Sequence, residues 1–160
     1  MSFHSLNSTD LQKFIDENQI EATILPLKEH TPTVVDAARV LDVETSQIIK
    51  SLVFITPDES LLVINNGLNR VDRKKIAAHL GLGKKRVKFA SPDQALAITG
   101  YVVGSMPPFG HLQKLPTLVD PAVVDQKVIF GGGGEINAMM RLDSAELARV
   151  TGARVVALSE

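Results

Sequence analysis

The stretch from Gly104 to His111, GSMPPFGH, has the composition of a rigid binding loop built from backbone groups. Glycine permits positive φ angles and lets backbone amides approach a ligand, whereas the paired prolines stiffen the chain and leave carbonyls free as acceptors. A second glycine-rich segment, GGGG at residues 131–134, follows the apolar run VIF. Clustered amides can bind an anion or polarise a carbonyl group. Each segment is therefore either a simple turn or one wall of a binding site.

Lys50 is a third candidate, because it is the only charge between Glu44 and Asp58. The surrounding run IIKSLVF is typical of a largely buried strand. A lysine in such a strand either extends its ammonium group to the surface or points into a pocket that holds an anionic partner.

The remaining candidate side chains give weaker signals. Ser105 lacks the G-x-S-x-G pattern of a hydrolase nucleophile, and His111 is a base, a nucleotide contact or a structural histidine. The other histidines, His4, His30 and His79, lack the spacing of metal ligands, so we expect neither a metal nor a cofactor. Without cysteine there is no thiolate nucleophile and no disulfide.

Charge is segregated along the chain although the net charge is only −1. Between residues 70 and 88 a single acid, Asp72, accompanies eight basic residues: Arg70, Arg73, Lys74, Lys75, Lys84, Lys85, Arg86 and Lys88. This basic run is either a solvated helix face and turn or a surface that contacts nucleic-acid phosphates.

The length of 160 residues and the 44% apolar content predict one domain over residues 1–160. No apolar run approaches the roughly 20 residues that cross a bilayer, and the N-terminus lacks the order of a signal peptide. We therefore expect a cytoplasmic protein without a membrane partner.

Hydrophobic periodicity and capping residues predict the elements that position these candidates. Helices are expected at 11–20, 34–41, 44–50, 73–80, 94–98 and 145–150, with caps at Thr33, Asp72 and Ser91. Strands are expected at 22–27, 50–56, 60–65, 101–104, 116–120, 127–131, 137–142 and 154–159. The mixture predicts an α+β fold with a mixed, mostly antiparallel, barrel-like curved sheet and helices outside.

In this order, the segments IIKSLVF, GLNRVDRKKIAAHLGLGKKRVKFASPDQALAITGYVVGSMPPFGH, TLVD and VIFGGGGE resemble the YbaK family of trans-editing aminoacyl-tRNA deacylases. That family is related to the editing insertion of bacterial prolyl-tRNA synthetases. The resemblance covers residues 20–150 and implies the YbaK fold.

The resemblance also implies roles for individual residues. The family lysine, which acts in substrate placement and activity, corresponds to Lys50, and the G-x-x-x-P loop that faces the aminoacyl ester corresponds to Gly104, Ser105, Met106, Pro107 and Pro108. The late glycine turn corresponds to Gly132, Gly133 and Gly134, although many relatives carry a small hydroxyl residue where Gly132 stands.

The implied function is hydrolysis of the ester of a mischarged aminoacyl-tRNA, with Cys, Ser, Thr or Ala as the amino acid. Lys50, Gly104, Ser105 and Pro108 are expected at the reacting groups, with Met106, Pro107, His111 and the glycine turn around the substrate. Arg70, Arg73, Lys74, Lys84, Lys85 and Arg86 are expected to contact tRNA phosphates. The partners would be aminoacyl-tRNA and a synthetase, without DNA. Two alternatives stay open, a non-catalytic tRNA- or nucleotide-binding module and a subunit that acts only with a synthetase.

Overall fold

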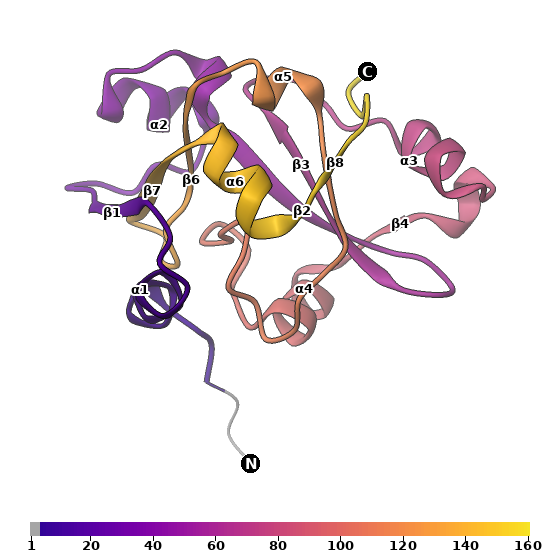
Figure 1. Ribbon diagram of the computed structural model, residues 1–160, viewed down its shortest axis with the longest axis horizontal. Helices are drawn as coiled ribbons and strands as arrows, with labels where there is room; N and C mark the ends of the chain where they lie inside the picture. The colour runs from indigo at the N-terminus through magenta and orange to yellow at the C-terminus, as the bar shows by residue number, and fades with distance from the viewer. Residues whose placement is uncertain (1–3) are drawn as a thin grey trace.

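The computed structural model describes residues 4–160, which form two β-sheets surrounded by helices (Figure 1). One sheet has the order β1-β7-β6 and is antiparallel throughout, with β1 (Ala22–Pro26), β7 (Ala138–Asp143) and β6 (Val128–Gly132). The other has the order β4-β2-β3-β5-β8, with β4 (Lys88–Phe89), β2 (Ile49–Ile55), β3 (Ser60–Asn66), β5 (Thr117–Val119) and β8 (Arg154–Val155). In this second sheet β2 pairs antiparallel with β3 and β4, whereas β3, β5 and β8 run parallel.

The helices lie around these sheets, and three of them begin at capping residues that the sequence predicted. They are α1 (Ser8–Glu17), α2 (Val34–Leu41), α3 (Arg73–Leu80), α4 (Pro92–Thr99), α5 (Pro121–Val124) and α6 (Ser144–Thr151), with 3-10 turns η1 (Thr45–Gln47) and η2 (Lys84–Arg86). The predicted caps Thr33, Asp72 and Ser91 are confirmed, since each side chain accepts a hydrogen bond from the first helical turn. Residues 44–50, expected as a helix, form only the 3-10 turn η1 before β2 begins.

The predicted α+β class with mixed sheets is confirmed. Closure into a barrel is not found among residues 4–160, because the two sheets stay separate and meet at one isolated bridge between Ile48 and Phe130. This bridge brings β6 beside the start of β2, so the late glycine-rich segment lies next to the strand that carries Lys50.

The strand predicted at residues 101–104 is wrong. Tyr101 is fully buried, but Val102 and Val103 are exposed, and the Ser105 amide donates to the Val102 carbonyl to close a turn. The apolar run YVV therefore does not pair with a neighbouring strand. Its first side chain enters the core, and the chain then reverses at Gly104, which has a φ of 95°.

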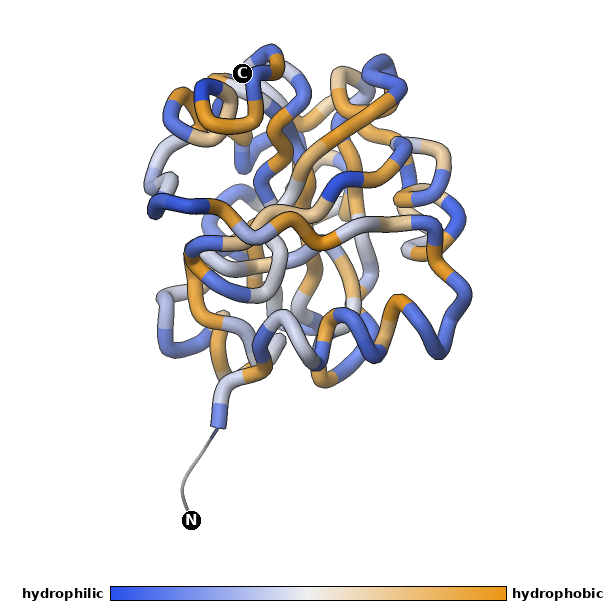
Figure 2. Tube along the Cα trace, turned by 90° about the vertical axis from the view of Figure 1, so that its left-hand side faces the viewer, coloured by the Kyte–Doolittle hydropathy of each residue, from blue (hydrophilic) through white to orange (hydrophobic). Residues whose placement is uncertain are grey.

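Strand β3 separates two hydrophobic cores, which explains its continuous apolar sequence. Leu62 and Ile64 face the main core between the sheets, whereas Leu61 and Val63 face a second core under α3. A strand covered on both faces loses the alternation of apolar and polar residues. The amphipathic helix α1 shows the opposite pattern, with hydrophobic and hydrophilic positions alternating along the tube in Figure 2.

Candidate functional site

A cavity of about 220 Å³ lies where the candidate segments converge. Lys50 from β2, Gly104 and Met106 from the GSMPPFGH loop, and Gly132 from β6 all line it. These residues are up to 82 positions apart in the sequence, and the pairing of β2 with its neighbours together with the Ile48–Phe130 bridge brings them together. The structure therefore brings residues from the Lys50 strand and from both glycine-rich segments together around a single cavity.

Lys50 is half-buried at this cavity and has a specific partner. Its ammonium group donates a hydrogen bond to the Asn69 backbone carbonyl, which also accepts a hydrogen bond from the Asn65 side chain at 3.0 Å. Burial, with a smaller contribution from nearby Arg70, lowers the pKa of Lys50. The anionic partner considered from sequence is not found, because no acidic side chain of residues 4–160 lies within ion-pair distance of this lysine. Its charge is therefore available to an anionic or carbonyl group that enters the cavity.

Ser105 stabilises the turn rather than facing the cavity. The residue is only 3% exposed, and its hydroxyl donates to the Val102 carbonyl at 2.7 Å. Its own carbonyl accepts a hydrogen bond from the Gly134 amide at 3.0 Å, which joins the two glycine-rich segments directly. The side chain therefore has the geometry of a turn-forming serine, and the loop is held by backbone contacts.

Gly132 has to be a glycine where the two segments meet. A Cβ atom at this position would lie 2.1 Å from the Met106 carbonyl oxygen, far inside any real contact. Gly133 and Gly134 do not line the cavity, and their amides donate to the carbonyls of Ala138 and Ser105. The close approach of β6 to the loop therefore sets the shape of the cavity wall. The Gly133 and Gly134 amides already donate hydrogen bonds within the protein, so they are not free to bind a ligand.

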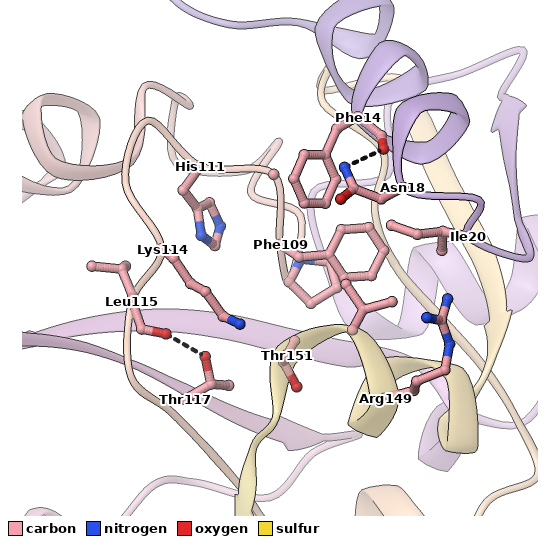
Figure 3. Close-up of a pocket in the computed structure, with 13 residues that line it drawn as sticks. Phe14, Asn18, Ile20, Phe109, His111, Lys114, Leu115, Thr117, Arg149 and Thr151 are labelled. Atoms are coloured by element: carbon pink, nitrogen blue, oxygen red, sulfur yellow. Dashed lines mark hydrogen bonds between the residues drawn. The ribbon is translucent and has the colours of Figure 1, made fainter.

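Pro107, Pro108 and His111 lie away from the cavity that holds Lys50. Both prolines are buried, and the His111 Nε2 atom is 2.8 Å from the Pro107 carbonyl oxygen. Pro108 and His111 line a second cavity of about 320 Å³, shown in Figure 3. Burial lowers the pKa of His111, which keeps its imidazole neutral at neutral pH. The first half of the loop thus lines one cavity and the second half lines the other.

The basic run forms an exposed surface over α3, η2 and β4. All eight of its cations are exposed, including the predicted phosphate contacts Arg70, Arg73, Lys74, Lys84, Lys85 and Arg86. Within the described part of the chain none of them forms an ion pair, although Arg73 donates to the Val87 carbonyl and Lys75 to the Ser159 carbonyl. A surface of this kind favours phosphate binding because its charge is not already neutralised.

Sequence reasoning missed several residues of the cavity wall. Phe89 lines the cavity, is 57% exposed and meets Phe54 edge-on, but no pattern in its own segment marks it as part of a site. Ser51 also lines the cavity, and its hydroxyl is buried without a hydrogen-bond partner in residues 4–160. A buried unpaired hydroxyl costs about 1–3 kcal/mol. This buried oxygen is therefore an unsatisfied polar atom behind the cavity wall.

The described residues are also informative about a metal site and a membrane-spanning helix. They include no group of three or more His, Cys, Asp or Glu side chains with the geometry to hold a metal ion. In the same residues, no helix is both long enough and apolar enough to cross a membrane.

The sequence profile of the aminoacyl-tRNA editing domain matches residues 28–150, which include every segment that lines the Lys50 cavity. The chain belongs to the aminoacyl-tRNA editing domain family. This is the YbaK-type family that the sequence motifs indicated, and the fold expected from it is confirmed by solved structures.

Several known proteins and solved structures are similar to the chain at moderate identity. An uncharacterised Bacillus subtilis protein, YwhH, is 26% identical over 136 residues, which cover 84% of this chain and 85% of that protein. The proline–tRNA ligase of Ligilactobacillus salivarius is 34% identical over 88 residues, 55% of this chain but only 15% of the ligase. A crystal structure described as that of a candidate trans-editing enzyme for prolyl-tRNA synthetase superposes with a TM-score of 0.90 at 29% identity, covering 96% of both chains.

Proposed function

We propose that this protein hydrolyses the ester bond of mischarged aminoacyl-tRNA in trans. The observation that carries the proposal is the convergence of Lys50, Gly104 and Gly132 on one cavity in a chain of the editing domain family. Editing of this kind is needed because a synthetase discriminates poorly between small side chains, so a second site removes the errors.

In the proposed reaction, water attacks the ester carbonyl carbon and the bond to the ribose oxygen of the terminal adenosine breaks. The products are the free amino acid and a tRNA whose terminal hydroxyl has regained its proton. Lys50 holds the ester region or the adjacent phosphate, and the backbone around Gly104 orients the carbonyl and the water. Fixed backbone dipoles stabilise the developing oxyanion without a covalent enzyme intermediate. A backbone mechanism of this kind agrees with the Ser105 hydroxyl donating inside its own turn.

The size of the cavity supports a small amino acid of the Cys, Ser, Thr or Ala type. Its volume of about 220 Å³ is below the roughly 300–1,000 Å³ of pockets that enclose a whole small molecule. The walls include Ile49, Val53, Ala90, Ala95 and Met106, so the enclosed part of the substrate is the aminoacyl group. The nucleotide then extends outward across the rim.

The proposed partners are aminoacyl-tRNA and a synthetase, in the cytoplasm. The exposed basic run supports contact with acceptor-stem phosphates, since it lacks acidic partners within residues 4–160. The similarity to part of a proline–tRNA ligase supports an association with the synthetase that charges the proline tRNA.

The test is a panel of tRNAs charged with different amino acids and incubated with pure protein. Deacylation of at least one mischarged tRNA, with correctly charged Pro-tRNA left intact, is the expected result. The alternative is a non-catalytic tRNA-binding module, and one observation favours it: Lys50 is the only ionisable side chain among the described residues that line the cavity. Saturable binding of charged tRNA with no deacylation across the panel would decide for the binding module.

A further inference from the structure

The second cavity is lined by the second half of the GSMPPFGH loop, does not include Lys50 and is the larger of the two. Its volume of about 320 Å³ is within the roughly 300–1,000 Å³ range of small-molecule sites. It is bounded by α1, by the segment 108–117 and by α6 (Figure 3). The proposed hydrolysis uses none of the side chains that point into it.

The floor of this cavity is apolar and contains two stacked aromatic rings. Phe14 of α1 and Phe109 of the loop have ring centroids 5.8 Å apart with an interplanar angle of 29°. Ile20, Leu115 and Val150 complete the apolar surface. A floor of this kind favours a ligand with a hydrocarbon or aromatic body, because burying apolar surface is the main source of its binding free energy.

One uncompensated positive charge faces that floor. In Figure 3 the Lys114 side chain extends into the cavity toward Phe109 and Thr151, and within residues 4–160 it has no hydrogen bond or ion pair. Arg149, at the other side, is already paired with Glu146 through two hydrogen bonds of 2.6 and 3.0 Å. None of the described lining residues is acidic, so Lys114 supplies the free charge of this site.

We propose that this cavity binds a small monocarboxylate whose apolar body packs on Phe14 and Phe109 and whose carboxylate pairs with the Lys114 ammonium group. The charges favour a monoanion, because a phosphate dianion carries one more negative charge than Lys114, the single unpaired cation among the described lining residues, can neutralise. A free amino acid would introduce an ammonium group that no acidic lining residue could pair with. The site is thus distinct in ligand chemistry from the cavity at Lys50.

The probe for this proposal is 3-phenylpropionate, titrated into the protein without tRNA and followed by calorimetry and by NMR of the aromatic rings. Saturable binding is expected, with 3-phenylpropanol, the neutral alcohol of the same shape, binding about tenfold more weakly or worse. Because no tRNA is present, this outcome is independent of the proposed deacylation.

Three variants test the role of the lysine. Lys114→Gln should weaken carboxylate binding about tenfold or more, whereas Lys114→Arg keeps the charge and should retain most of it. Lys127→Gln, at another exposed lysine, is the matched control and should bind like the wild type. Circular dichroism establishes that each variant is folded. Equal affinity for acid and alcohol, unchanged affinity in Lys114→Gln, or displacement of the carboxylate by equimolar inorganic phosphate would each overturn the proposal.

Discussion

Lys50 is the residue on which the proposed chemistry depends most directly. Its ammonium group is held by the Asn69 carbonyl, a neutral partner, at a cavity that no other ionisable side chain of residues 4–160 lines. A neutral acceptor fixes the position of the cation without cancelling its charge. The same geometry explains why the strand tolerates a lysine, because the charged end has both a hydrogen-bond partner and partial contact with solvent.

Replacing Lys50 with alanine should therefore lower single-turnover deacylation by about 100-fold or more, since loss of one positioning contact can cost that much. The melting temperature should change little, because the lysine is not part of the core. Lys28→Ala, at an exposed lysine outside the cavity, serves as the control. Full activity in a folded Lys50→Ala protein would refute the assignment.

The pH dependence gives a second test of the same residue. Because burial lowers the pKa of Lys50, its charge is lost at a lower pH than that of a free lysine. Enzymatic deacylation, measured relative to spontaneous ester hydrolysis, should decline as the pH rises through that lowered pKa. The Lys50→Arg variant stays protonated and should keep a flat profile over the same interval. Identical profiles for the two proteins would show that the charge of Lys50 is not required.

Gly132 provides a test of the cavity wall. Gly132→Ala should lower the free energy of unfolding by about 1–3 kcal/mol, as overpacking does, and should strongly reduce deacylation because the Met106 carbonyl has to move. Gly83→Ala is the matched control, since a Cβ atom there meets nothing within 4 Å. Chemical denaturation and single-turnover kinetics measure the two effects, and a fully active, equally stable Gly132→Ala protein would contradict the packing argument.

At the scale of elements, α3 and η2 present the exposed basic residues on one segment of the chain. Replacing Lys84, Lys85 and Arg86 together with alanine should weaken tRNA binding and flatten its dependence on salt, because each lost phosphate contact removes released counterions. Binding isotherms at several salt concentrations measure the slope. A triple variant at Lys13, Lys127 and Arg154, which are exposed elsewhere, should keep the wild-type slope. Equal slopes in both triple variants would mean that the basic run is only a solvated surface.

Most elements were predictable because their signals are local. The caps Thr33, Asp72 and Ser91 mark helix starts through short-range hydrogen bonds, and the β2–β3 hairpin follows from two apolar runs separated by a short turn. The strand predicted at 101–104 failed because its apolar side chains do not share one environment. Tyr101 fills the core, whereas Val103 lines the cavity.

The residues that line the site were only partly predictable, because some of them give local signals in the sequence and others do not. Lys50 and Gly104 are unusual in their own segments, so the sequence itself identifies them. Phe89 and Met139 join the cavity through strand pairing and packing between distant segments, which no local pattern encodes. The separation of His111 from the Lys50 cavity likewise depends on the path of the loop through the fold.

At the scale of the whole molecule, Glu146 joins α6 to the start of β1. Its carboxylate accepts hydrogen bonds from Arg149 and from the Glu21 amide, and these contacts lower its pKa to about 2. A carboxyl group with a lowered pKa stabilises the fold above its ordinary pKa, and that contribution is lost as the pH falls from about 4.5 through about 2.

Glu146→Gln should therefore lower the melting temperature at pH 7, by about 2–4 °C for each 1 kcal/mol lost in a protein of this size. The difference from the wild type should shrink as the pH is lowered toward 2. Glu17→Gln, whose side chain is 62% exposed, is the control and should show little difference at any pH. A constant gap across the pH series would mean that ionisation of Glu146 does not contribute.

The backbone hydrogen bond between Ser105 and Gly134, together with the approach of Gly132 to Met106, has a consequence for how this protein can change over evolutionary time. The loop geometry is held by main-chain hydrogen bonds, by the glycine at position 132 and by the Ser105 hydroxyl that closes the turn. Side chains such as Val103 and Met139, which line the cavity without holding the loop, can then vary one at a time. A lineage could alter which amino acid is accepted while the arrangement that acts on the ester is inherited unchanged. Directed evolution of new substrate ranges should therefore begin at Val103 and Met139.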